Sequence, residues 1–232
     1  MRVLVVEDEP LIARRVQQFC RRILGDSLET LASVGSFDAA SAYLAEKPVD
    51  VVLLDLNLSG QDGMELLATY VAGSFHTIIV SANTDQALRA FEYGVIDFVA
   101  KPFTEERLTQ ALERVSNPTG RTPYSARCLA VHKLGRVELI SMDDVLYIEG
   151  AGKYSELVLV DGRRELHDKT LVHLEVVLPA IFERIHKSYI VRMSAVARFH
   201  VFEGTRYEAE LKNGMRLPVG RTRYHEIKAR LK

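Results

Sequence analysis

Cysteine is scarce in this sequence. The two cysteines, Cys20 and Cys128, lie far apart, and neither is flanked by residues at metal-ligand spacing. They provide no disulfide framework, and such sparse cysteine is typical of proteins in a reducing cytosol.

Long apolar runs and zinc-site motifs are missing as well. The first apolar run, Val3 to Val6, is too short for a signal peptide, and no stretch approaches the length of a membrane span. The histidines of the second half show neither HExxH nor paired CxxC spacing, and that half has no nucleophile–base pair. We therefore expect a cytoplasmic protein that is not an enzyme and has no membrane contact.

The net charge of −1 hides an asymmetry. Residues 1–117 contain 10 Lys and Arg against 17 Asp and Glu, a balance of −7, whereas residues 118–232 contain 20 against 14, a balance of +6. This pattern indicates an acidic module joined to one that binds a polyanion.

Short runs rich in Val, Ile and Leu alternate with amphipathic stretches in the first half. The runs fall at 2–6, 28–34, 50–54, 76–80 and 96–100. Pro10 suits the first turn of a helix, and Ser36 and Thr104 are suited to cap two others. Alternating β and α units predict a parallel sheet covered by helices on both faces.

A stretch rich in Ser, Pro, Gly and Thr divides the chain. We expect a domain at 1–117, a linker at 118–126 and a second domain at 127–232. The second domain shows period-two runs, and the pairs Asp161-Gly162 and Asn213-Gly214 predict type I′ hairpins. With one helix at 169–178, it should be mostly antiparallel β.

Polar residues follow the predicted parallel strands where each strand ends. In chain order they are Glu7, Asp8 and Glu9, then Asp55, Ser81 and Lys101. Because ligands of such sheets bind beyond the carboxyl ends of the strands, these groups should converge. Glu9 precedes Pro10 and serves equally well as part of a helix cap.

The converging groups predict phosphoryl chemistry. Carboxylates of Glu7, Asp8 and Asp55 suit Mg²⁺, which takes few protein ligands and keeps waters and phosphate oxygens. Lys101 would supply a positive charge for a phosphoryl group and Ser81 a hydroxyl. Asp55 is left as the nucleophile, since carboxylates can form aspartyl phosphates.

The segments "VLVVEDEP", "LLDLNLSGQDGMELL", "IIVSAN" and "DFVAKPF" resemble the receiver domain of bacterial two-component response regulators. We expect its flavodoxin-like, doubly wound sheet of five parallel strands in the order 2-1-3-4-5. The resemblance implies that Asp55 is the phosphoacceptor, with a sensor histidine kinase as partner and Mg²⁺ as cofactor. It also implies direct metal binding by Asp8 and Asp55, a water-mediated contact from Glu7 and a ligand in the backbone carbonyl of Asn57.

The same resemblance implies a switch and a dimer face. Ser81 and Lys101 would contact the phosphoryl group, and movement of Ser81 would free space for Phe98, which is otherwise a plain core residue. Phosphorylation would then produce a homodimer. The residues expected on its face are Arg89, Tyr93, Asp97 and Arg107.

The second domain resembles the LytTR DNA-binding domain. The resemblance rests on "VLYIEGAGKYSELVLVDG", "LEVVLPAIFERIHKSYIVRM" and "LKNGMRLPVGRTRYHEIK". It implies an elongated β fold that places loops into successive major grooves of promoter DNA. The residues expected to contact DNA are Lys153, Tyr154 and Ser155, then His186, Lys187 and Ser188, with Arg192, and finally Arg221 and Arg223 beside Gly220. Arg192 and Gly220 depart from the commoner Asn and Ser.

The function predicted is a phosphorylation-dependent transcriptional regulator of the LytR/AlgR type. The alternative is a receiver that controls a β module binding a protein partner or RNA. Salt dependence separates DNA binding from a hydrophobic protein interface, because binding through DNA phosphates weakens steeply with salt.

Overall fold

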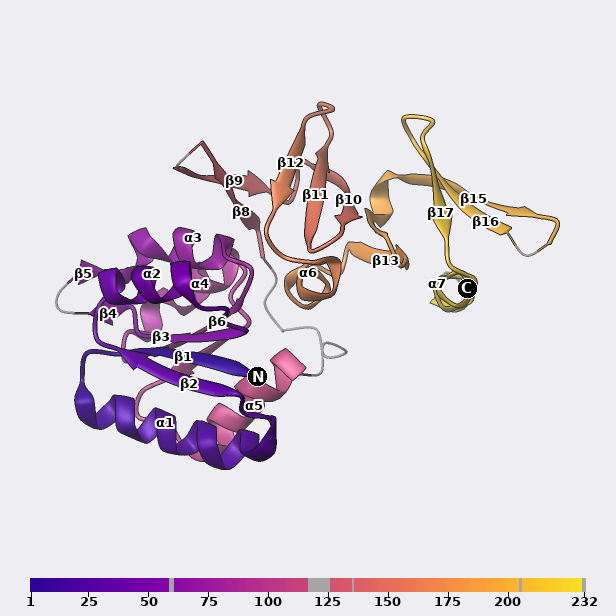
Figure 1. Ribbon diagram of the computed structural model, residues 1–232. Coiled ribbons are helices and arrows are strands. Elements are labelled where there is room, and N and C mark those ends of the chain that lie inside the picture. The colour runs from indigo at the N-terminus through magenta and orange to yellow at the C-terminus, as the bar shows by residue number, and fades with distance from the viewer. Residues whose placement is uncertain (59–60, 117–125, 135, 205, 231–232) are drawn as a thin grey trace.

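The computed structural model describes residues 1–232 except 59–60, 117–125, 135, 205 and 231–232, and within the elements it leaves out the side chains of 61–66, 88 and 116 (Figure 1). The linker expected at 118–126 lies almost entirely outside the described residues. Among those described, no helix combines the length and apolar character needed to cross a membrane.

The first domain is built on a five-stranded parallel sheet, as expected. Its strands are β1 (Arg2–Val6), β2 (Thr30–Val34), β3 (Val51–Leu54), β6 (His76–Ser81) and β7 (Asp97–Ala100). Their order across the sheet is β2-β1-β3-β6-β7, with every neighbouring pair parallel. This is the predicted order 2-1-3-4-5, because β4 (Asn57–Leu58) and β5 (Gln61–Asp62) form a separate small hairpin after β3.

Helices cover both faces of this sheet. They are α1 (Pro10–Leu24), α2 (Phe37–Glu46), α3 (Gly63–Ala72), α4 (Ala87–Glu92) and α5 (Glu105–Ser116), with short 3-10 turns η1 (Gly25–Ser27) and η2 (Thr84–Gln86). Helices α1 and α5 lie on one face, and α2, α3 and α4 on the other (Figure 1). The predicted caps are confirmed: Ser36 Oγ accepts the Ala39 N–H at 3.2 Å, and Thr104 Oγ1 accepts the Arg107 N–H at 3.3 Å.

The second domain is mostly antiparallel β, as expected, and its described residues form three sheets. Strands β8 (Cys128–Lys133) and β9 (Arg136–Ser141) form a hairpin. The five-stranded sheet has the order β12-β11-β10-β14-β13, with β10 (Val145–Ala151), β11 (Tyr154–Leu159), β12 (Arg164–His167), β13 (Phe182–His186) and β14 (Tyr189–Arg192). The third sheet is β15 (Val196–Phe202), β16 (Arg206–Leu211) and β17 (Arg216–Val219).

Two helices accompany these sheets. The expected helix is α6 (Leu171–Val177), and η3 (Met193–Ala195) is a 3-10 turn. The sequence did not predict α7 (Arg221–Arg230). Among its described residues, only Ile227 is buried, so α7 lacks the periodic apolar residues by which a helix is predicted from sequence.

The predicted hairpin turns form, but their type differs from the prediction. A type I′ turn needs positive φ at both central residues. Gly162 and Gly214 have φ of 88° and 84°, whereas Asp161 and Asn213 keep negative φ. Instead, Asp161 Oδ1 accepts the Arg163 N–H at 2.9 Å, and the Asn213 side chain accepts the N–H two residues ahead in the same way, which stabilises a different turn.

The two domains pack against each other. The β8–β9 hairpin lies against α3 (Figure 1), and the ring of His173 in α6 lies 4.5 Å from the ring of His76 in β6, measured between centroids. Ala130 of β8 joins the apolar cluster formed by α3 and its neighbours. At the end of α4, the Arg127 N–H donates to the Glu92 carbonyl at 2.9 Å. A Cβ on Gly94 would come within 3.4 Å of Ala126, so the domains are in close contact there.

Candidate functional site

The first candidate site lies at the carboxyl edge of the parallel sheet. Glu7 and Asp8 follow β1, Asp55 follows β3, Ser81 ends β6 and Lys101 follows β7. The Val, Leu and Ile residues of β1, β3 and β6 are buried, so the sheet fixes where the polar groups after these strands emerge. The structure thus brings together the residues that the sequence predicted to converge.

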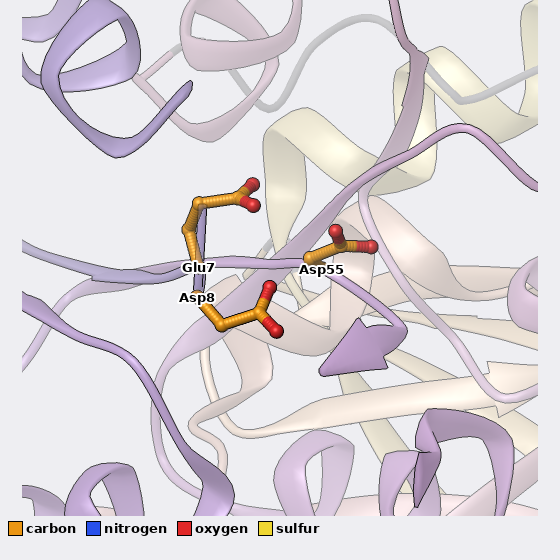
Figure 2. A group of neighbouring side chains, drawn as sticks. All are labelled: Glu7, Asp8 and Asp55. Carbon is orange, nitrogen blue, oxygen red and sulfur yellow. The ribbon is translucent and has the colours of Figure 1, made fainter. Parts of the chain in front are cut away.

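Three carboxylates form the acidic part of this site. One oxygen from each of Glu7, Asp8 and Asp55 lies within 4.8 Å of the other two. Figure 2 shows the carboxylates of Glu7 and Asp8, from the end of β1, extending toward the side on which Asp55 follows β3. Such an oxygen-only cluster suits a hard cation such as Mg²⁺.

Lys101 supplies the positive charge that this cluster needs. Its Nζ lies 2.6 Å from Asp55 Oδ2 and 2.7 Å from Glu7 Oε2, and the ammonium is buried with them. Burial lowers the pKa of Lys101, but the hydrogen bonds to Asp55 and Glu7 outweigh it and leave the pKa raised. For Glu7, burial dominates over Lys101 and raises the pKa of the carboxyl. The peptide bond between Lys101 and Pro102 is cis.

Ser81 and Asn57 complete the surroundings of Asp55. Ser81 is fully buried, and its Oγ has no hydrogen-bond partner among the described residues. An unpartnered buried hydroxyl beside a carboxylate cluster is suited to a polar group that enters the site. The Asn57 N–H donates to Asp55 Oδ1 at 3.0 Å, which fixes the orientation of that carboxylate.

The residues expected in the switch and dimer face lie in different environments. Phe98 is buried, with its side chain in the core next to α4. Arg89 is exposed and Tyr93 half-buried. Asp97 is only 1% exposed, and its carboxylate accepts from Arg107 at 2.7 Å and also pairs with Arg114, so it cannot itself present a free charge on a surface.

The second candidate site is formed by three segments of the second domain, which are residues 150–154, 186–188 and 220–223. The Gly150 N–H donates to the Ser188 carbonyl at 2.9 Å, which joins the first segment to the second. The Gly220 N–H donates to the Ile185 carbonyl at 2.8 Å, which joins the third. The three segments therefore follow one another along one side of the domain (Figure 1).

The exposed cations of these segments are those predicted from the sequence. Lys153, Lys187 and Arg221 are exposed, while Tyr154 and Arg223 are half-buried. His186, also half-buried, accepts the Ser188 N–H through Nδ1 at 3.2 Å, which shapes the second segment. The pKa of His186 is lowered, first by burial and then by its cationic neighbours.

Two residues expected to contact DNA lie elsewhere. Ser155 is fully buried, and its Oγ donates to the Lys169 carbonyl at 2.8 Å. Arg192 donates to the Met142 carbonyl, and its guanidinium lies 5.6 Å from the Phe182 ring. Both side chains are used inside the domain, so these two expectations are corrected.

Sequence reasoning also missed Arg184 and Glu175, whose contacts shape the second candidate site. Arg184 stands two residues before His186 in a strand, and Glu175 lies in the predicted helix. Each resembles an ordinary charged surface residue in the sequence, and their pairing depends on how α6 packs against the five-stranded sheet, where it contacts β10 and β14.

Comparisons with known proteins agree with this architecture. Residues 3–113 match the response regulator receiver domain, and residues 135–232 match the LytTr DNA-binding domain. The sensory transduction protein LytT of Bacillus cereus is 28% identical over 250 residues, covering 100% of this chain and 99% of the relative. The transcriptional regulatory protein LytR of Staphylococcus aureus is 26% identical over 243 residues, covering 99% and 98%. A solved LytTr DNA-binding domain of a response regulator from Bacillus cereus is 19% identical, with a TM-score of 0.42, and covers 46% of this chain and 98% of that chain.

Proposed function

Since the chain belongs to the response regulators that join a receiver to a LytTR DNA-binding domain, we propose that phosphorylation of Asp55 controls its binding to promoter DNA. In this proposal a sensor histidine kinase is the phosphoryl donor. The phosphorylated chain dimerises and contacts duplex DNA through the three segments of its second domain.

One observation carries the proposal. Lys101 Nζ lies 2.6 Å from Asp55 Oδ2 at the point where the carboxylates of Glu7, Asp8 and Asp55 converge. A nucleophilic carboxylate, a cation for phosphoryl oxygens and a metal-type acidic cluster are the parts that phosphoryl transfer requires.

The donor set fits Mg²⁺. Asp8, Asp55 and the backbone carbonyl of Asn57 would hold the ion directly, and Glu7 would act through a water. When bound, the ion would neutralise charge on the phosphoryl oxygens and on the cluster itself.

The protein's own groups carry the transfer. A carboxylate oxygen of Asp55, oriented by the Asn57 N–H, forms the new P–O bond as the bond between phosphorus and the donor breaks. Lys101 moves its hydrogen bond from the Asp55 oxygen to a phosphoryl oxygen, where negative charge is spread. The Ser81 hydroxyl, which has no hydrogen-bond partner among the described residues, donates to another phosphoryl oxygen.

The DNA-binding part is supported by charge and placement. The second half carries a balance of +6, and Lys153, Lys187 and Arg221 stand exposed on adjoining segments. Cations on loops held by a rigid sheet can contact phosphates and read base edges in the major groove.

Two measurements test the proposal. Acetyl phosphate with Mg²⁺ should add the mass of one phosphoryl group to the intact protein, and neither the Asp55→Asn variant nor a chelated sample should gain it. Phosphorylated protein should then bind duplex DNA with an affinity that falls steeply as salt increases. Persistent phosphorylation of Asp55→Asn would refute the assignment of Asp55 as the phosphoacceptor. Binding that does not change with salt would favour a protein partner. Equal or tighter binding of a matched single-stranded RNA would favour RNA as the ligand.

A further inference from the structure

Arg184 of β13 lies beneath the second segment of the proposed DNA surface. Its side chain is only 11% exposed. Nε donates to the His186 carbonyl at 2.7 Å, and Nη2 donates to the Lys187 carbonyl at 2.6 Å. Two consecutive carbonyls of the segment therefore turn inward onto one guanidinium, while the Lys187 side chain remains exposed.

Glu175 of α6 links this arrangement to the third segment. Its Oε2 lies 3.4 Å from Arg184 Nη1, and its Oε1 lies 3.3 Å from Arg223 Nη2. One carboxylate thus joins an arginine under the second segment to an arginine in the third. The backbone bond from Gly220 to Ile185 reinforces the same junction.

The chemistry of this junction requires an arginine. A guanidinium is a planar fork whose donors can meet two carbonyls and a carboxylate at once, whereas a lysine ammonium is a point charge on a flexible stem. All three guanidinium nitrogens of Arg184 form hydrogen bonds within the chain.

We propose that Arg184 is a positioning residue of the DNA interface, which fixes Lys187 and, through Glu175, Arg223 in the register needed to read DNA. This inference rests on the proposed function, since it assumes that these segments contact DNA. It adds that their geometry is set from beneath by a residue that does not touch DNA.

A competing role for Arg184 is direct phosphate contact. Arg184 lines a cleft of about 250 Å³ together with Lys187 and Tyr154, and a phosphate could enter such a cleft. Substitution by lysine separates the two roles, because lysine can still meet a phosphate but cannot hold two carbonyls and a carboxylate with the same geometry.

The first experiment uses the full chain without DNA. In Arg184→Lys, amide hydrogen exchange should quicken at Ser188 and Gly150, whose N–H groups are bonded within the joined segments. Arg163→Lys, an exposed arginine paired with Asp161 at the distant β11–β12 turn, is the matched control. Unchanged exchange at Ser188 in Arg184→Lys would overturn the proposal.

The second experiment measures affinity for a duplex enriched from a random pool by the phosphorylated protein. Arg184→Lys should bind this duplex about tenfold more weakly, as expected for a displaced base contact, while its affinity for unrelated duplex and its salt slope stay unchanged. Circular dichroism checks that the variant is folded.

A combined variant shows whether Arg184 acts through the side chains that it positions. Arg184→Lys combined with Lys187→Ala and Arg223→Ala should bind within about twofold of the Lys187→Ala, Arg223→Ala double mutant, because positioning has no effect once both positioned side chains are gone. Additive losses would overturn the proposal. A direct phosphate contact would also overturn the proposal. It would appear as full DNA affinity in Arg184→Lys together with a salt slope lowered by about one in Arg184→Gln. If no duplex is enriched, the proposed function fails, and the exchange experiment still decides whether Arg184 fixes the segment.

Discussion

Lys169 Nζ, in the second domain, lies 2.7 Å from the carbonyl oxygen of Gly73, in the first domain. The same amine also donates to the Val71 carbonyl at the end of α3. Lys169 is 3% exposed, and burial lowers the pKa of its amine to about 7. Its own carbonyl accepts from Ser155, next to the first segment of the second candidate site, so one residue joins α3 to that segment.

Replacing Lys169 by methionine should destabilise the chain in alkaline solution. At pH 9 the neutral amine satisfies two buried carbonyls, whose loss of a partner costs about 1–3 kcal/mol. Because the pKa is lowered from 10.5 to about 7, the unfolded chain binds more protons between these values, and wild-type stability rises with pH there. The difference in unfolding free energy between wild type and Lys169→Met should therefore decrease by roughly 1.4 kcal/mol for each pH unit from pH 9 to pH 7.

Urea unfolding of both chains across this pH range checks the prediction. Lys212→Met, which removes an exposed lysine, is the control and should leave the pH dependence intact. A gap between wild type and Lys169→Met that does not change with pH would contradict the buried position of the amine.

Acid should weaken the chain through two buried histidines. Burial lowers the pKa of His76 and of His167 to about 3, well under the ordinary value of 6.5. Between these values the unfolded chain binds protons that the folded chain does not, so stability is lost as pH falls below 6.5. At pH 5.5 the loss is about 1.4 kcal/mol for each histidine.

Denaturation midpoints of His76→Gln and His167→Gln test this expectation. Each variant should be less stable than wild type at pH 7.5, and the stability of each should fall less steeply than that of wild type between pH 6.5 and pH 5. His225→Gln, an exposed histidine on α7, is the matched control. An equally steep decline in all chains would show that other groups cause it.

The sequence predicted the convergence of polar groups at the sheet edge better than it predicted the contacts between elements. Residues that follow buried parallel strands meet at one edge of the sheet, so the sequence alone predicts that Asp55 and Lys101 lie close together. Lys169 offered no such signal, because a single lysine before a helix resembles a solvated one. Helix α7 was not predicted for a related reason: Ile227 is its main buried side chain, and its packing contacts are with β13 and β16. Ser155 was misassigned because a polar residue beside a loop gives no sign of which side it faces.

Lys101→Met should destabilise the metal-free protein. It leaves the buried carboxylates of Asp55 and Glu7 without their cation, and removal of one partner of a buried pair costs about 3–5 kcal/mol. Mg²⁺ should recover part of this loss, and should stabilise the variant more than wild type. Thermal unfolding with and without Mg²⁺ gives the answer, with Lys47→Met as an exposed control. No difference in the Mg²⁺ response would contradict a shared acidic cluster.

Phosphorylation should promote dimerisation through the surface of α4 and α5. Arg89, Tyr93 and Arg107 are accessible there, and buried Asp97 positions Arg107 rather than meeting a partner itself. Beryllofluoride with Mg²⁺ should raise the sedimentation mass toward that of a dimer, and Arg89→Glu with Tyr93→Ala should weaken the dimer by about tenfold. Arg14→Glu, which changes an exposed residue of α1 on the opposite face of the sheet, should leave the dimer unchanged. An activated chain that remains a monomer would refute dimerisation.

Arg221→Ala should weaken specific DNA binding by about tenfold to a hundredfold, because a bidentate base contact is worth roughly 1–3 kcal/mol. Arg221 is the exposed first residue of α7, directly after the Gly220 bond that joins the third segment to the second. If it reads a base, the loss on unrelated duplex should be much smaller. If it contacts phosphate, both duplexes should weaken alike, and the salt slope should fall by about one. Fluorescence anisotropy over a salt series separates these outcomes, with Arg163→Ala as the control. Full affinity in the folded Lys187→Ala, Arg221→Ala double mutant would show that DNA binds elsewhere on the domain.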